Sequence, residues 1–474
     1  MKRNQFAIAA IVLAIGALSG CASTPVGPPT LDLPAATQSP GVLASDRWWT
    51  AFNDPALDKL VDEALAHNLD LAAAITRVDY ARSQVLFAQS DLYPSVDIVG
   101  DASRNRSTQA GTNPLPPGYS PISQDFRVGV QASYELDLWG KYRTATRAAR
   151  ADLLASEYAR ETVRTVVAAQ TAQSYFGLVA ADAELALLQD TLKSRNESLA
   201  LQRDRMQGGV IGEFEFHTSE AEVAAVQGDI AVAKRAVAEY ESALAALAGR
   251  SPRDVFTPQI ERDRQVKAFT TVPQVPAGLS SDILQRRPDI QQTEAQLTAA
   301  NLRIDVARAD YFPAISLTGV FGSEAGLLKN LFSGPAMIWG IGASLAQPLI
   351  GLKAIEANVD AQTARRNELL INYTRTVQSA FKDAHDALSA NETTREALAA
   401  QTERATRLSQ SLELSDLRYK SGYSPYLEVL DSQRQLLQAQ TLQIVAARNA
   451  RLALVDLAKA LGGGWDYPNA VARR

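Results

Sequence analysis

The stretch RYKSGYSPYLEVLD, residues 418 to 431, interrupts more than a hundred residues of otherwise helical composition. Glycine ends helices because it adopts the left-handed conformation without strain, and proline is tolerated in the first turn of the next helix. Gly422 and Pro425 therefore predict a turn between two helices. Glu428 and Asp431 follow within six residues of the proline, and should lie one turn apart on one helical face.

A second stretch, RMQGGVIGEFEFHT at residues 205 to 218, resembles the first and predicts an internal duplication. Each half is expected to contain a helix, two strands, a very long helix and a return helix. At an offset of 213 residues, the identical positions include Ser198, Leu199, Arg205, Gly209, Glu215, Ser219, Gln227 and Gly249 in the first half and Ser411, Leu412, Arg418, Gly422, Glu428, Ser432, Gln440 and Gly462 in the second.

Alternating segments in each half predict β-strands with one apolar face. In FRVGVQASYELDL (126–138) and MIWGIGASLAQ (337–347), apolar residues alternate with polar or small ones, which is the period of a strand. The segments after Pro94 and Pro313 behave similarly with weaker contrast. Four strands of about ten residues are long enough to cross a bilayer when tilted. A four-stranded soluble sheet packed on helices is the alternative.

Residues 141–207 and 352–420 predict two very long helices. The first contains one glycine, Gly177, and no proline, and the second contains neither. At 1.5 Å per residue each helix would be about 100 Å long. Return helices are expected from about Glu213 to Ala248 and from Pro425 to Leu461. Helices of this length must lie side by side, and taken alone they also fit an extended coiled-coil scaffold.

The N-terminus predicts export and lipidation. Lys2 and Arg3 precede an apolar run from Phe6 to Leu18, and the small residues of LSGC end at Cys21. This pattern is a secretory signal over residues 1–20, and it resembles a bacterial lipoprotein cleavage site at which Cys21 receives a covalent lipid. An ordinary signal peptide with an incidental cysteine is the alternative. The chain has no second cysteine, so no internal disulfide is possible.

Charge and motifs argue against nucleic-acid binding and catalysis. Without Lys2 and Arg3, 45 of the 47 basic residues remain, against 52 acidic residues. This mild net negative charge disfavours a nucleic-acid partner. The three histidines are scattered, and no metal-binding pair, phosphate loop or nucleophile motif is present. We therefore expect no enzyme activity, no metal and no cofactor beyond the lipid. Trp48 and Trp49 are expected to pack in a core rather than to stack on sugars.

Taken together, these features resemble the outer-membrane efflux channels of the TolC and OprM type, particularly their lipoprotein branch. The resemblance covers the mature chain almost end to end. It is carried by the two glycine turns, the Tyr-Pro and Phe-Pro pairs before the strands, RWWTAFNDPALDKLV (47–61) followed by HNLDL, ELDLWGK (135–141) and QRRPDIQQTEAQL (285–297).

The resemblance implies a mainly α-helical chain with a membrane β-barrel. Three chains would close one twelve-stranded barrel in the outer membrane, and the helical hairpins would continue it as a tunnel through the periplasm. The implied segments are a signal peptide (1–20), a lipidated N-terminus with an equatorial part (21–65), the first repeat (66–249), an equatorial linker (250–281), the second repeat (282–462) and a C-terminal tail (463–474).

The resemblance also assigns roles to the two turns. They would be the periplasmic tips that meet an adaptor protein, through Gly208, Gly209, Val210, Gly212, Ser421, Gly422, Tyr423, Ser424 and Pro425. It places a constriction on Tyr419, Glu428 and Asp431. Without the resemblance, the two acids would be explained by the helix dipole alone. In a trimer they would form carboxylate rings, which favour cations.

The chain departs from the family pattern at two positions near these turns. Ser424 stands where some members carry an arginine that helps to latch the helices, so the sequence does not identify the latch. Glu215, the twin of Glu428, should lie in the same region, but Thr218 replaces the second acid. The first turn is therefore less suited to form a ring.

The expected function is that of a passive efflux duct. The homotrimer would receive substrates from an inner-membrane pump through a periplasmic adaptor, and its other contact would be outer-membrane lipid. The lipoprotein branch makes a proton-driven pump the expected partner. A type I secretion duct, a general porin and a structural coiled-coil envelope lipoprotein are the alternatives, and the sequence leaves the exported substrate open.

Overall fold

The computed structural model describes residues 47–108, 110–111, 116, 118–262 and 287–463. The signal segment and Cys21 lie outside the described residues. The chain separates into two compact units, each with segments from both repeats. The first contains residues 79–155 and 294–372, and the second contains the described parts of 31–78, 156–293 and 373–474. The spatial units therefore cut across the duplication.

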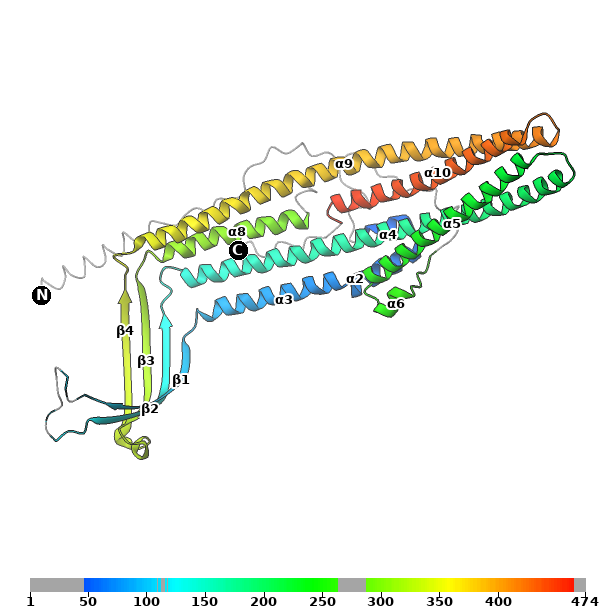
Figure 1. Ribbon diagram of the computed structural model, residues 1–474. Helices are drawn as coiled ribbons and strands as arrows, with labels where there is room; N and C mark the ends of the chain where they lie inside the picture. Colours follow the sequence, from blue (N-terminus) through cyan, green and yellow to red (C-terminus); the bar gives the residue numbers. More distant parts are fainter. Residues whose placement is uncertain (1–46, 109, 112–115, 117, 263–286, 464–474) are drawn as a thin grey trace. The chain divides into compact units, whose positions relative to one another are not determined.

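The first unit contains a four-stranded antiparallel sheet in the order β1-β2-β3-β4 (Figure 1). Its presence confirms the four strands that were expected from alternation. Short 3-10 turns, η4 (Leu328–Asn330) and η5 (Gly334–Ala336), lie between the last two strands. The strand bounds are β1 Ser95–Arg106, β2 Ile122–Glu135, β3 Ala314–Ala325 and β4 Met337–Ala346.

The strands pair residue by residue without a bulge. Residues that face one side on one strand therefore stay on that side across all four strands. Ile98 is opposite Val130, which is opposite Phe321, which in turn is opposite Trp339. This face is strongly apolar and open to its surroundings, and Ile341 is 86% exposed. A soluble sheet packed on helices would cover such a face, so the soluble-sheet alternative is wrong.

Aromatic contacts join the ends of the strands to the helices that flank them. The indole of Trp139, which follows β2, stacks on Phe312 with 4.9 Å between ring centroids. Its Nε1 donates a hydrogen bond of 2.8 Å to the carbonyl of Pro313, just before β3. The ELDLWGK motif and the Phe-Pro pair thus meet, which fixes where the chain leaves the sheet.

The helices account for most of the described chain, and the two long ones begin and end where predicted. Both return helices end one residue earlier than expected, at Leu247 and Ala460. α10 also begins one residue later, because Pro425 precedes the first helical residue instead of lying in the first turn. The bounds are η2 Trp48–Phe52, α2 Pro55–His67, α3 Leu69–Ser90, α4 Lys141–Gln207, α5 Glu213–Leu247, α6 Pro252–Phe256, α8 Pro288–Ala309, α9 Leu352–Lys420 and α10 Tyr426–Ala460.

No helix among the described residues combines the length and the apolar character needed to cross a membrane.

The return helices end in the same way, which shows the duplication in the backbone. Gly249 after α5 and Gly462 after α10 both have positive φ, 66° and 89°. In each case the following residue donates a backbone hydrogen bond five residues back, from Arg250 to Ala245 and from Gly463 to Ala458. This is the Schellman arrangement, which satisfies the carbonyls at a helix end.

The core of the second unit lies where η2 and α2 pack against the helices. Trp48 and Trp49 are almost completely buried, with their rings 5.8 Å apart in an edge-to-face arrangement. They belong to one cluster with Leu57, Leu178 and Leu454. The prediction that these tryptophans pack in a core is confirmed.

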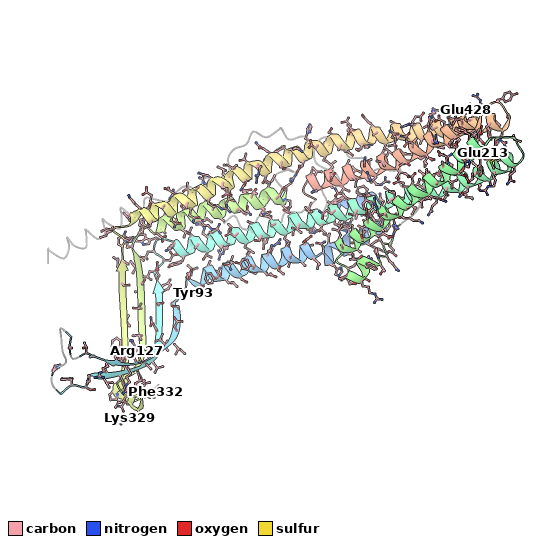
Figure 2. The ribbon with its side chains drawn as sticks, in the orientation of Figure 1. Tyr93, Arg127, Glu213, Lys329, Phe332 and Glu428 are labelled. Atoms are coloured by element: carbon pink, nitrogen blue, oxygen red, sulfur yellow. The ribbon has the colours of Figure 1, made fainter. Side chains whose placement is uncertain are left out.

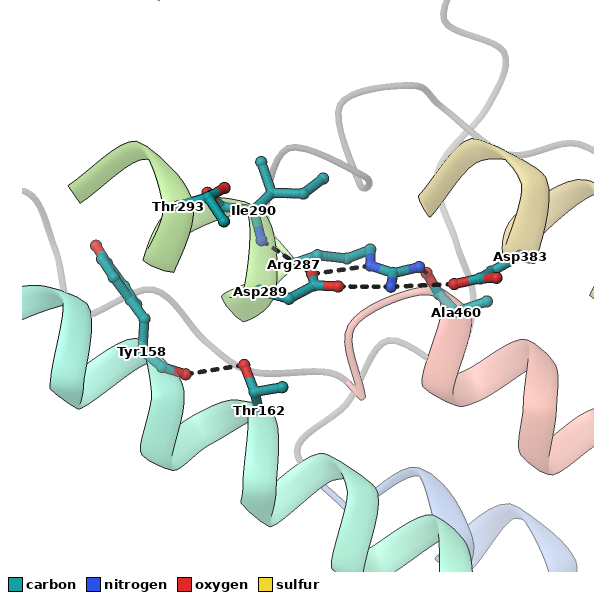
Figure 3. Close-up of polar contacts among 8 residues, drawn as sticks. All are labelled: Tyr158, Thr162, Arg287, Asp289, Ile290, Thr293, Asp383 and Ala460. Carbon is teal, nitrogen blue, oxygen red and sulfur yellow. Dashed lines mark hydrogen bonds and ion pairs between the residues drawn. The ribbon is translucent and has the colours of Figure 1, made fainter. Parts of the chain in front are cut away.

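Arg287 of the QRRPDI motif ties three helices of the second unit together (Figure 3). Its guanidinium donates to Asp289 at the start of α8 at 2.7 Å, to Asp383 of α9 at 3.3 Å and to the carbonyl of Ala460 in α10 at 3.3 Å. Burial by itself lowers the pKa of Arg287, but the hydrogen bonds with Asp289 and Asp383 outweigh it and the pKa is raised. The motif therefore has a structural role: it holds α8, α9 and α10 together.

Candidate functional site

The turn between α4 and α5 is built on Gly209. This residue has a φ of 71°, which is the conformation that ends a helix without strain only for glycine. Its N–H donates to the carbonyl of Met206 at 3.0 Å, and that of Val210 donates to Arg205 at 2.8 Å. Gly212 then caps the start of α5.

The turn between α9 and α10 repeats this geometry 213 residues later. Gly422 has a φ of 77°, its N–H donates to Tyr419 at 3.0 Å, and that of Tyr423 donates to Arg418 at 2.9 Å. The predicted helix-to-helix turns are thus confirmed, and both are Schellman motifs. Pro425 occupies the N-cap of α10.

The side chains of the two turns are mostly exposed. Val210 and Tyr423, which occupy equivalent positions after the two glycines, are largely open, the latter at 82%. Gly208, Ser421 and Pro425 are exposed, and Ser424 is half-buried. Among the described residues, the Ser424 hydroxyl has no hydrogen-bond partner. Ser424 therefore supplies no link between the helices here.

Tyr419 joins the two helical hairpins of the second unit. Its hydroxyl accepts hydrogen bonds from Gln202 Nε2 at 3.2 Å and from the Arg205 guanidinium, both on α4. The same guanidinium lies 4.9 Å from the centre of the Tyr419 ring, a cation–π contact. On its other side Tyr419 packs against Tyr426 of α10, 5.5 Å away.

Glu428 and Asp431 lie on α10 just inside the second turn (Figure 2, which labels Glu428). Arg418, at the end of α9, lies 3.4 Å from Glu428, so this ion pair closes across its own turn. Asp431 is exposed and accepts a hydrogen bond of 2.5 Å from Gln435. Both carboxylates are spaced one turn apart on α10.

Glu215 occupies the equivalent place at the start of α5 but has different surroundings. It is half-buried, and a Cβ added at Gly212 would lie 3.4 Å from its Oε2, so the carboxylate turns back towards the helix N-terminus, where it is favoured electrostatically. Within the described chain, Glu215 forms no ion pair, whereas Glu428 pairs with Arg418.

A buried charge cluster further along the helices escaped sequence reasoning. Glu222 of α5 accepts from Arg434 Nε of α10 at 2.8 Å and lies 3.4 Å from Arg195 of α4. The side chain of Arg195 is only 3% exposed and that of Glu222 only 12%. Burial lowers the pKa of Arg195, whereas the hydrogen bond with Glu222 raises that of Arg434. One carboxylate therefore links three helices.

The fold and these tips define a class of protein: a chain with a lipid-compatible β-sheet and long helical hairpins, as in bacterial outer-membrane channels. The family model described as "Outer membrane efflux protein" matches two ranges, residues 60–250 and 279–463. The chain belongs to the outer membrane efflux protein family, and the two ranges correspond to its two halves.

Individual relatives agree with this family. The chain is 34% identical over 464 residues to the probable efflux pump outer membrane protein TtgC of Pseudomonas putida. The aligned residues cover 94% of this chain and 93% of the relative. It is 30% identical to the probable outer membrane lipoprotein SilC of Salmonella typhimurium, over 88% of each chain. The CmeC outer membrane channel of Campylobacter jejuni superposes with a TM-score of 0.85 at 30% identity, covering 93% and 95% of the two chains.

Proposed function

We propose that this protein is the outer-membrane duct of a tripartite efflux system and that three copies close one twelve-stranded barrel. The sheet order leaves β1 and β4 each paired on one side only. An open edge is not tolerated in a bilayer, and bacterial barrels have at least about eight strands. Four strands therefore need further copies, and this unpaired apolar sheet is the observation that carries the proposal.

The strand length fits this role. The ten residues of β4 span about 33 Å at 3.3 Å per residue. Strands in such barrels tilt by about 40°, which brings the span close to the apolar band of about 25 Å. Because the helices join the strands at one end, they would all extend to one side of the membrane, the periplasm.

The two turns would be the docking site of a periplasmic adaptor. Val210, Phe214 and Tyr423 are large apolar side chains that stand largely exposed there. Exposed apolar surface at one location marks an interaction site, and a helical hairpin of the adaptor would cover it. The relatives named as efflux pump components support an inner-membrane pump as the next partner, and we propose a proton-driven one.

Glu428 and Asp431 would form the constriction of the duct, with Tyr419 beside them. Three copies of each acid would surround the axis and concentrate cations. Since Ser424 makes no link, we assign the latch to Arg205, whose contact with Tyr419 holds the second hairpin against the first. Glu215 would line the same region without forming a ring.

The proposed duct is anchored by a lipid and is passive. Cys21 would carry a covalent lipid, as the similarity to a named lipoprotein supports. The duct would perform no catalytic step and would use no energy of its own. The names of the relatives favour an efflux role over a type I secretion duct or a general porin.

The test is reconstitution of the purified full chain in a planar bilayer, with cross-linking to count its copies. We expect trimers and discrete ion currents that are small without the adaptor. Well-inserted protein without current would favour the structural envelope lipoprotein instead. A large current indifferent to the adaptor would favour a general porin.

A further inference from the structure

The two faces of the sheet differ in charge as well as in polarity. The apolar face, which includes Ile98, Phe126 and Trp339, carries two charged residues within the four described strands, Arg104 and Arg106. The opposite face carries Asp97, Asp101, Asp125, Arg127, Glu135 and Glu324. The two arginines therefore share a face with apolar residues and with no acid.

Both arginines lie at one end of the apolar band. Ala102, Phe126 and Ala325 face one another on the last rung that β1, β2 and β3 share. Arg104 and Arg106 pair with β2 beyond this rung, where the two strands continue as a ribbon that bends out of the line of the upright strands (Figure 1). Arg104 and Arg106 lie two and four residues past Ala102, which places them about 7 and 13 Å beyond this rung.

Among the described residues, neither arginine side chain has a partner. Both arginines are exposed, and in the part of the chain that the structure describes neither guanidinium takes part in an ion pair or a hydrogen bond. The nearest acids along β1 and β2, Asp101 and Asp125, point to the other face. Two adjacent positive charges at the end of this apolar surface therefore have no counter-charge among the described residues.

We propose that Arg104 and Arg106 bind the phosphate headgroup of a membrane lipid at the outer end of the barrel. A guanidinium binds phosphate through two parallel hydrogen bonds. The apolar stems of the arginines can lie along the acyl region while their charges reach the headgroups. The proposal rests on the proposed membrane insertion, because the strand ends remote from the helices then lie in the outer leaflet.

The experiment uses the full chain in phosphatidylcholine nanodiscs titrated with lipid A, a lipid with two phosphate groups, and follows the thermal midpoint. Lipid that binds the folded protein raises this midpoint by mass action. For Arg104→Ala with Arg106→Ala, we expect the lipid A concentration at half-maximal shift to rise about tenfold or more. Arg104→Lys with Arg106→Lys should recover most of the affinity.

Arg127→Ala is the matched control, because it removes an arginine from the other face of the same strands. It should titrate like the wild type. An equal loss in this control, or no loss in the double alanine variant, would overturn the proposal. Equal stabilisation by dephosphorylated lipid A or by inorganic phosphate would also overturn it.

The same samples separate this inference from the proposed function. If the wild type conducts in a planar bilayer but the arginine pair does not affect lipid A binding, only the lipid site is wrong. If the well-inserted wild type does not conduct, the duct itself is wrong and the site loses its basis.

Discussion

The two turns of the second unit have the same backbone but different side-chain contacts. Gly209 and Gly422 both end their helices in the left-handed conformation, with the same pair of hydrogen bonds. Arg205 and Arg418 are twins in the duplication, yet Arg418 pairs with Glu428 across its own turn, whereas Arg205 crosses to Tyr419 of the other hairpin.

This difference shows how a duplicated structure acquires an asymmetric site. The Schellman turn depends on glycine and on backbone carbonyls, so it survives wherever glycine is kept. The contacts of a long side chain depend on which helix lies beside it, and the two repeats have different neighbours. The second turn thus keeps two acids near the tip, while the first contributes the arginine that holds it.

The largest expected loss of stability comes from changing Glu222, whose carboxylate links α5 to α4 and α10. Glu222→Gln leaves Arg195 buried without its counter-charge, which should cost about 3 kcal/mol of stability. Thermal unfolding of the full chain should show a midpoint several degrees lower. The control is Glu403→Gln, which removes an exposed pair with Arg407, and an equally small change in both variants would contradict this interpretation.

Substitution of the two glycines tests whether the two turns depend equally on the left-handed backbone conformation. Gly209→Ala and Gly422→Ala should each cost about 1–2 kcal/mol, because alanine is strained at positive φ. A Cβ at either position has no atom within 4 Å, so crowding adds nothing and the two costs should agree. Hydrogen exchange of the Val210 and Tyr423 amides measures each turn. A much larger loss at one turn would show that they are not equivalent.

The smallest expected effect comes from removing the contact between Arg205 and Tyr419, which distinguishes the first turn from the second. Arg205→Ala and Tyr419→Phe should each raise single-channel conductance, and the double variant should add little, since both remove the hydrogen bond from the Arg205 guanidinium to the Tyr419 hydroxyl, which is worth about 1 kcal/mol. Lys420→Ala removes a positive charge that pairs within its own helix and should leave conductance unchanged. If it raises conductance as much as Arg205→Ala, net charge rather than the latch explains the effect.

The sequence predicted the backbone well because backbone signals are local. Apart from Gly177, the absence of glycine and proline marked α4 and α9 to the residue, and alternation marked the strands. Leu430, Leu437 and Ile444 are seven residues apart, the spacing of a coiled-coil seam, and all three pack in hydrophobic clusters of the second unit.

The side-chain network could not be predicted in the same way. Glu222 and Arg434 are 212 residues apart, and each resembles a solvated charge on a long helix. A periodic pattern shows that a helix has a packed face but not which charged residue lies opposite. Only the spatial pairing of α5 with α10 shows that these two side chains meet.

The central claim is that the second turn, and not the first, forms the constriction of the duct. The most direct test compares single-channel conductance and cation selectivity for Glu428→Ala with Asp431→Ala against Glu215→Ala, both in the full chain. The claim predicts a larger, less cation-selective current for the pair in α10 and a wild-type current for the change in α5. Equal effects of the two changes, or no effect of the α10 pair, would contradict it.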